Sequence, residues 1–232
     1  MPISAPSSLP VWHLLTRLGE AQILLPAALL AALALLRRAE ARPLLARWVA
    51  LLGAATLVTI ATKVAFIGWG IGWAEVNFTG VSGHAMFAAA VYPLLLGVLA
   101  SGAPRSGRLF AIFAASMLAL LVGVSRVVVG AHSVSEVIAG LLVGGGVSAG
   151  ALAIVRLPPR LIGRAIPAVV ALWLMVMPAH APASRSHSVV TKLSLLVSGH
   201  KVPYTRSDML HKLRPRQAMS CEPRPRPETF AA

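Results

Sequence analysis

Acidic residues are scarce in this chain of 232 residues, which has 7 Asp and Glu against 21 Lys and Arg and a formal net charge of +14 at pH 7. Charged residues of both signs make up 12% of the chain, hydrophobic residues make up 57%, and the mean hydropathy is +0.78. Soluble domains have about 25% charged residues. The composition therefore excludes an ordinary soluble domain and predicts a protein of the lipid bilayer.

Cysteine is almost missing as well. Cys221 is the single cysteine, which excludes a disulfide within the chain and a zinc site built on cysteines. The excess of positive charge predicts no nucleic-acid partner, because the Arg and Lys residues lie in short loops between apolar runs or near the C-terminus. Loop charges that orient spanning helices, and a tail that faces anionic lipids, account for this distribution.

Six apolar stretches approach the roughly 20 residues that a spanning helix needs. They are centred on residues 22–36, 48–62, 85–100, 109–124, 137–155 and 165–177. The predicted fold is an all-α polytopic transmembrane bundle of about six spans. The sixth stretch is the weakest, because it is short and is bracketed by Pro167 and Pro178.

The chain divides into three predicted regions. Residues 1–20 predict an N-terminal interfacial segment, because Trp12, Leu15 and Leu18 share one face of a short helix. Residues 21–179 form the transmembrane domain. Residues 180–232, rich in Ser, Pro, His and Arg, predict a disordered basic C-terminal tail. Close packing between helices is predicted at a run of small residues, Gly140, Gly144, Gly145 and Gly146.

Positive loop residues follow a pattern that orients the bundle. One set of alternate loops contains nine arginines, whereas the other set contains only Lys63 and Arg126. The nine are Arg37, Arg38, Arg42, Arg47, Arg105, Arg108, Arg156, Arg160 and Arg164. By the positive-inside rule the first set is cytoplasmic, so Lys63 and Arg126 lie on the periplasmic or extracellular side.

Polar residues and one glycine gather at the same, non-cytoplasmic, ends of the predicted spans as Lys63 and Arg126. The whole set is Lys63, Ser82, Gly83, His84, Ser125, Arg126, His132 and Glu136. Ionisable groups at membrane depth are costly and mark functional sites. Fixed cations and the backbone N–H groups at the start of a helix bind anions, so the cluster predicts a phosphate pocket.

The histidines and the carboxylate supply what phosphoryl transfer still needs. His132 and Glu136 are spaced i and i+4, so Glu136 can accept the proton of one ring nitrogen and leave the other free to attack phosphorus. His132 is therefore the candidate nucleophile, and His84 is the candidate general acid.

Each of these residues also fits a structural role. "SVSE" from Ser133 to Glu136 has the pattern of a helix capping box, in which Glu136 only caps backbone N–H groups. Ser82 fits an ordinary N-cap, and Lys63 fits a lysine that reaches for the membrane interface. These roles leave unexplained why so many polar residues fall on one side.

Two motifs carry a resemblance to a known family. "SRVVVGAHSVSE" resembles the third signature of the type 2 phosphatidic acid phosphatase (PAP2) superfamily, and "GVSGHAMF" resembles its second. The resemblance implies an all-helical core, metal-independent chemistry and no cofactor. It also implies roles for individual residues: Lys63, Ser82, Gly83 and Arg126 hold phosphate, His84 protonates the leaving group, His132 is transiently phosphorylated and Glu136 orients it.

The chain departs from the family pattern in several places. The Arg-Pro of the first signature is missing after Lys63, so one phosphate contact is lost or supplied elsewhere. Val81 replaces the usual Pro, and Glu136 replaces the usual Asp. Two clear spans precede the second signature, where such family members commonly have three.

Together these patterns predict an integral membrane lipid phosphatase, in the bacterial inner membrane with its site on the outer side. Its substrate is a phosphomonoester or diphosphate of a phospholipid or an isoprenoid lipid. Two other functions remain open, a lipid phosphotransferase and a non-catalytic lipid-phosphate binder or transporter. The sequence carries no signal for an oligomeric state.

The tetrapeptide VSGH occurs twice, from Val81 and from Val197. The first copy precedes an apolar span, where a helix N-terminus can bind an anion. Pro203 follows the second copy closely, and no long apolar run surrounds it. We therefore expect no role in the site for His200.

Overall fold

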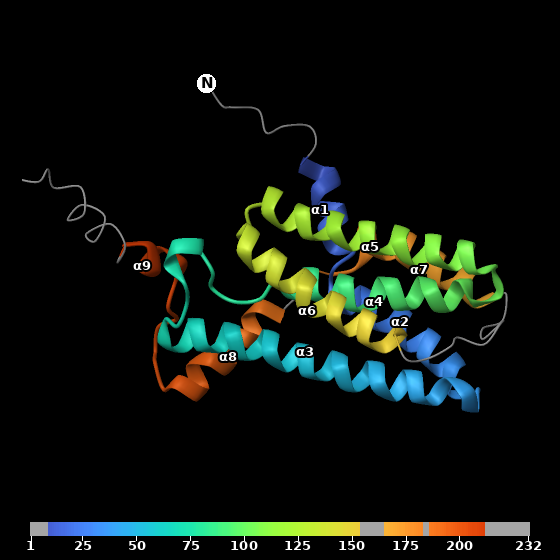
Figure 1. Ribbon diagram of the computed structural model, residues 1–232. Helices are drawn as coiled ribbons and strands as arrows, with labels where there is room; N and C mark the ends of the chain where they lie inside the picture. The colour runs from blue at the N-terminus through green and yellow to red at the C-terminus, as the bar shows by residue number, and fades with distance from the viewer. Residues whose placement is uncertain (1–8, 154–164, 183–185, 212–232) are drawn as a thin grey trace, which may run out of the picture.

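The computed structural model describes residues 9–153, 165–182 and 186–211, and these residues are mainly helical. The helices are α1 (Leu9–Arg17), α2 (Ala21–Leu36), α3 (Arg42–Trp69), α4 (Gly83–Leu99), α5 (Arg105–Val128), α6 (Val134–Leu152), α7 (Ala165–His180), α8 (Ser186–Ser198) and α9 (Arg206–His211). Short 3-10 turns cover Ala39–Ala41, Ala74–Val76 and Ala100–Gly102. An all-α membrane protein is thus confirmed (Figure 1).

The candidate spans are close to the predicted number. Within the described residues, α3 with its preceding turn, α4, α5 and α6 are long and apolar enough to cross a membrane. The pair α1 and α2, bent by 46°, gives a fifth if it counts as one span. The sixth predicted stretch forms α7, a shorter apolar helix of 16 residues.

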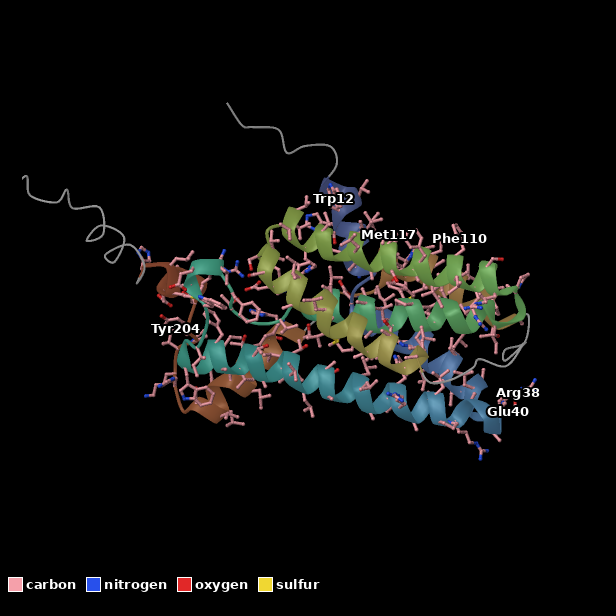
Figure 2. All side chains as sticks on the ribbon, in the orientation of Figure 1. Trp12, Arg38, Glu40, Phe110, Met117 and Tyr204 are labelled. Atoms are coloured by element: carbon pink, nitrogen blue, oxygen red, sulfur yellow. The ribbon has the colours of Figure 1, made fainter. Side chains whose placement is uncertain are left out.

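Helix α4 forms the centre of the bundle. In its spanning window 72% of residues are buried, against 28% in α3 and in α5. It packs mainly against α5 and α6. The outer helices keep an apolar face exposed, as Phe110 and Met117 do on α5 (Figure 2). This pattern suits helices whose outer faces contact lipid tails.

Two of the four predicted packing glycines bring α6 onto α4. A Cβ on Gly140 would lie 2.6 Å from the carbonyl oxygen of Ser82, and one on Gly144 would overlap that of Met86. Gly145 and Gly146 have no described atom within 4 Å of such a Cβ. The close approach fixes the start of α4 against the first turn of α6, since Ser82 N–H donates to the Glu136 carbonyl oxygen at 3.1 Å.

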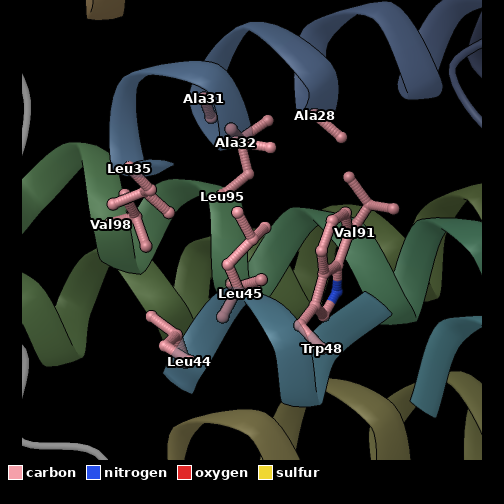
Figure 3. A pocket seen from close by; sticks show the side chains of 11 residues that line it. Ala28, Ala31, Ala32, Leu35, Leu44, Leu45, Trp48, Val91, Leu95 and Val98 are labelled. Atoms are coloured by element: carbon pink, nitrogen blue, oxygen red, sulfur yellow. The ribbon is translucent and has the colours of Figure 1, made fainter. Parts of the chain in front are cut away.

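At the other end of the bundle, α2, α3 and α4 converge around a small apolar void (Figure 3). Its volume of about 20 Å³ is enough for at most one water molecule. The indole N–H of Trp48 is satisfied there, because it donates to the carbonyl oxygen of Ala90 at 3.0 Å. We therefore regard this void as a packing defect and not as a ligand site.

The predicted disorder of residues 180–232 is wrong for residues 186–211, which contain α8 and α9. Helix α8 packs on the last turns of α3, and Phe66, Ile67 and Met209 form a small second core. The rings of Phe66 and Tyr204 meet edge to face with centroids 5.6 Å apart. Residues 212–232 lie outside the described residues.

The C-terminal helices lie at the end of the bundle where α3 ends and α4 begins (Figure 1). Helix α7 runs back to this end, because Arg17 and Gln22 donate to the carbonyl oxygens of Ala181 and Pro182. Figure 2 places Tyr204 at the opposite end from Arg38 and Glu40. The loop with Arg38 and the C-terminal helices therefore lie at opposite ends of the bundle, while the predicted loop arginines Arg156, Arg160 and Arg164 lie outside the described residues.

Helix α1 matches the short N-terminal helix expected within residues 1–20. It packs against α5, and Thr16 in its last turn is buried. The hydroxyl of Tyr92 donates to the carbonyl oxygen of Leu18 at 2.8 Å, which ties the bend between α1 and α2 to the central helix. An interfacial position for α1 stays a prediction.

Candidate active site

A cavity of about 810 Å³ opens among the ends of α3, α4, α5 and α6 for which the loop charges predict an outer position. Five of the seven predicted site residues line it: Lys63, Gly83, His84, Arg126 and His132. Ser82 and Glu136 are fully buried directly behind the cavity wall. The structure therefore brings the predicted cluster together, although the seven residues span 74 positions from first to last.

The side chains of His132 and Glu136 form a hydrogen-bonded pair. His132 lines the cavity, and Glu136 lies behind it. His132 Nδ1 lies 2.7 Å from Glu136 Oε2. His132 is not part of α6, because Ser133 is the N-cap of that helix. The reach of Glu136 back to His132 therefore comes from the capping geometry and not from a shared helix face.

The capping box proposed as the structural alternative is also present. Ser133 N–H donates to Glu136 Oε2 at 3.1 Å, and Glu136 N–H donates to Ser133 Oγ at 3.4 Å. One carboxylate oxygen therefore caps the helix and accepts from the imidazole. Glu136 thus fits both explanations, as the partner of His132 and as the cap of α6.

The second oxygen of Glu136 has its own donors. Oε1 accepts from the backbone N–H and the hydroxyl of Thr79, the former at 2.8 Å. Arg206 Nη2 donates to Oε1 at 2.8 Å and to Oε2 at 2.9 Å. A fully buried carboxylate requires such compensation, because an unpaired charge at this position is strongly destabilising. We conclude that Glu136 is held in its ionised form.

The protonation state of His132 follows from these contacts. Burial lowers the pKa of His132 below its ordinary value; the hydrogen bond to Glu136 opposes this shift, and the positive charge of Lys63 adds to it. The imidazole is therefore neutral at pH 7. A carboxylate only accepts, so Nδ1 carries the proton and Nε2 keeps a lone pair.

Arg126 and Ser82 have polar atoms that lack a protein partner. Arg126 Nη1 donates to the Thr16 hydroxyl at 3.0 Å, but among the described residues neither its buried Nε nor the buried Ser82 Oγ has a partner. Ser82 occupies the N-cap of α4 without a side-chain capping bond. Unsatisfied buried polar groups cost about 1–3 kcal/mol each and call for an explanation. Oxygens of a bound anion would supply it.

Lys63 and Gly83 differ in detail from the sequence prediction. Helix α3 continues to Trp69, so Lys63 lies inside the helix and lines the cavity. A lysine that reached for the membrane interface would instead lie at the end of the helix. Within the described part of the chain, a Cβ on Gly83 would contact only Thr59, at an ordinary 3.8 Å. No described protein atom therefore requires glycine at this position, and the expected close backbone approach would have to involve a ligand.

Sequence reasoning missed several residues of the site. Thr79 precedes the VSGH motif with one glycine between them. Gly19 lets the bend after α1 close over His84, because a Cβ there would lie 3.0 Å from His84 Cβ. Arg206 had one local signal, the capping pattern "TRSD", which begins α9. Thr205 N–H donates to Asp208 Oδ2 at 2.9 Å as that pattern predicts.

Metal ligands are not grouped in the described part of the chain. No set of three or more His, Cys, Asp or Glu side chains among residues 9–153, 165–182 and 186–211 is placed to hold a metal ion. The charges that line the cavity come from side chains of the protein.

Comparison with known proteins agrees with the two motifs. The profile of the PAP2 superfamily matches residues 69–160. An uncharacterized 22.5 kDa protein in the cps region of Klebsiella pneumoniae is 36% identical over 208 residues, which is 87% of this chain and 98% of that protein. Phosphatidylglycerophosphatase B of Bacillus subtilis (strain 168) is 38% identical over 72 residues, 30% of this chain and 36% of that protein. No solved structure matches the chain. The chain belongs to the PAP2 superfamily.

Proposed function

We propose that this protein is a lipid phosphatase that hydrolyses a phosphomonoester or a diphosphate of a phospholipid or isoprenoid lipid through a phosphohistidine intermediate. The observation that carries the proposal is the pair of His132 and Glu136, which lies beside a cavity lined by Lys63 and Arg126. The pair provides a nucleophile with a free lone pair, and the two cations provide a binding site for phosphate.

The proposed reaction has two steps. In the first, His132 Nε2 attacks phosphorus, an N–P bond forms, and the P–O bond to the leaving group breaks while His84 donates a proton to the departing oxygen. In the second, water attacks the phosphohistidine, His84 accepts a proton from it, and inorganic phosphate leaves as the N–P bond breaks. Glu136 stabilises the positive charge that develops on the imidazole in both steps.

The walls of the cavity suit a lipid. Ile60, Phe66, Phe87, Val189 and Val190 line it beside the charged residues. A volume of about 810 Å³ exceeds what a phosphate alone needs and falls in the range of small-molecule pockets. The apolar wall would hold the first part of a lipid chain while the headgroup reaches the cations.

Phosphate release by the purified protein tests the proposal. The substrates are a panel of phosphatidic acid, phosphatidylglycerol phosphate, and an isoprenoid monophosphate and diphosphate in detergent micelles. Labelled substrate and rapid acid-free quenching should trap a base-stable, acid-labile phosphohistidine. Orthovanadate, which mimics the pentacoordinate phosphorus, should inhibit.

The control variant is His13→Ala, because His13 is an exposed histidine of α1 that does not line the cavity. His132→Ala should abolish both turnover and labelling, whereas His13→Ala should retain both. Phosphate transferred to a second lipid in place of water would identify a phosphotransferase. Binding of lipid phosphates without turnover on any substrate would identify a binder and refute the proposal.

A further inference from the structure

Arg206 reaches the catalytic pair from the C-terminal segment, 70 residues after Glu136 in the chain. Its Nη2 donates to both oxygens of Glu136, at 2.8 and 2.9 Å, and lies 3.4 Å from the Thr79 hydroxyl. The side chain of Arg206 is 34% exposed, whereas that of Glu136 is fully buried. The interaction is therefore a contact between a cation at the cavity wall and a buried carboxylate, and not a surface ion pair.

The segment that carries Arg206 is fixed to the end of α3 by specific contacts. Tyr204 N–H donates to the Ile67 carbonyl oxygen at 2.9 Å, and His200 Nδ1 donates to the Gly68 carbonyl oxygen at 2.6 Å. The Tyr204 ring also packs on Phe66. These contacts hold the backbone two residues before Arg206, so its guanidinium has a defined position.

The charges of the site divide into two groups. Glu136 is compensated by Arg206, while Lys63 and Arg126 line the cavity without a carboxylate partner among the ion pairs of the described residues. Glu136 thus has a cation partner of its own, separate from the two cations that are proposed to hold phosphate.

Arg206 also restricts the carboxylate geometrically. One nitrogen bonds both oxygens, so the Glu136 carboxylate cannot rotate without losing a charge-assisted hydrogen bond. Oε2 therefore stays 2.7 Å from His132 Nδ1, and the imidazole stays in the tautomer whose Nε2 is free. Outer partners that orient the ligands of metal sites are worth about 10- to 100-fold in affinity or activity, and we take the same range for Arg206.

We propose that Arg206 is a positioning residue for the pair of His132 and Glu136, so that the C-terminal segment 186–211 is part of the active enzyme. This inference rests on the proposed function. It predicts an effect on turnover and not on substrate binding, because Arg206 contacts the carboxylate whereas phosphate is held by Lys63 and Arg126.

The experiment compares full-length variants by kcat, KM and the inhibition constant of vanadate. Arg206→Met, which keeps the length of the side chain, should lower kcat by about 10- to 100-fold and change KM and vanadate inhibition less than threefold. Millimolar methylguanidine should restore part of the activity of Arg206→Ala, which shows that the variant is folded. Lys201→Met, at an exposed cation of the same segment, should stay within twofold of the wild type.

Other outcomes overturn the inference in different ways. An unchanged kcat in Arg206→Met means that the residue has no role in turnover. A raised KM and weaker vanadate inhibition at constant kcat would make Arg206 a phosphate ligand. A higher kcat would make the segment an inhibitory cover. A wild type without turnover on any lipid phosphate would instead refute the proposed function itself.

Discussion

Replacing Glu136 by Gln tests the candidate site most sharply, because every polar neighbour of the carboxylate is a donor. Thr79 N–H, Ser133 N–H and His132 Nδ1–H donate at 2.8, 3.1 and 2.7 Å, and Arg206 donates to both oxygens. An amide of the same length replaces one acceptor by an NH₂ donor. Whichever way the amide is placed, its NH₂ group faces a donor.

The two placements of the amide have different chemical consequences. With NH₂ toward His132, the imidazole must move its proton to Nε2, which removes the nucleophile's lone pair. With NH₂ toward Thr79 and Arg206, the tautomer is kept but the negative charge that stabilises the imidazolium is lost. Both placements therefore slow the chemical step.

The expected loss of turnover is about 10² to 10⁴. The upper value corresponds to the carboxylate-to-amide change in a serine protease triad, where the wrong tautomer results. At about 1.36 kcal/mol per factor of ten, this range equals about 3–5 kcal/mol of transition-state stabilisation. Hydrogen bonds to charged groups are worth about 1.5–3 kcal/mol each, so the variant should also unfold at a lower temperature.

The assay measures initial rates on the best lipid phosphate together with thermal unfolding in detergent. Glu136→Asp is the matched control, because it keeps the charge and loses one methylene. We expect its turnover to fall less than that of the Gln variant. Turnover of the Gln variant within about fivefold of the wild type would limit Glu136 to capping α6 and refute this mechanism.

Three further predictions address the pKa, the packing and the orientation. Burial lowers the pKa of His132, and the neutral form of this residue reacts. After correction for the ionisation of the substrate, kcat/KM should therefore stay level from pH 7 downward and fall only below about pH 6.5. A fall of kcat/KM that begins above pH 7 would contradict this. Gly140→Ala should destabilise the protein by about 1–3 kcal/mol or more in thermal unfolding, while Gly145→Ala should not. In a cysteine-free background, Glu75→Cys should react with an impermeant maleimide on intact cells and Ser106→Cys only after permeabilisation; the reverse would invert the orientation.

Much of the fold is predictable because its signals are local. The apolar lengths of α3, α4, α5 and α6 are visible in single stretches of sequence, and a bundle of alternating helices places their ends at two levels. Lys63 and His132 therefore come to one cavity through topology, without any information on side-chain packing. The capping pattern at Ser133 and Glu136 was equally local, and the structure contains it.

The C-terminal segment was not predictable from composition for a physical reason. Averaged over residues 180–232, Ser, Pro and Arg hide the few apolar residues that matter, Tyr204 and Met209. These pack on Phe66 and Ile67, which lie more than 130 positions earlier. Such a contact depends on the shape of two surfaces and has no periodicity that a sequence pattern can reveal.

The two copies of VSGH show how position in the fold decides what a tetrapeptide does. The first copy begins α4, whose first residues Gly83 and His84 line the cavity, so the N-terminal end of the helix and the positive end of its dipole lie beside it. The second ends α8, with Gly199 in a left-handed conformation at φ 71°, and there the free groups are carbonyl oxygens, which repel an anion. Its histidine instead donates to the Gly68 carbonyl oxygen and fixes the segment that carries Arg206. If Arg206 positions Glu136, the second copy serves the same site as the first, by holding the segment in place and not by binding phosphate.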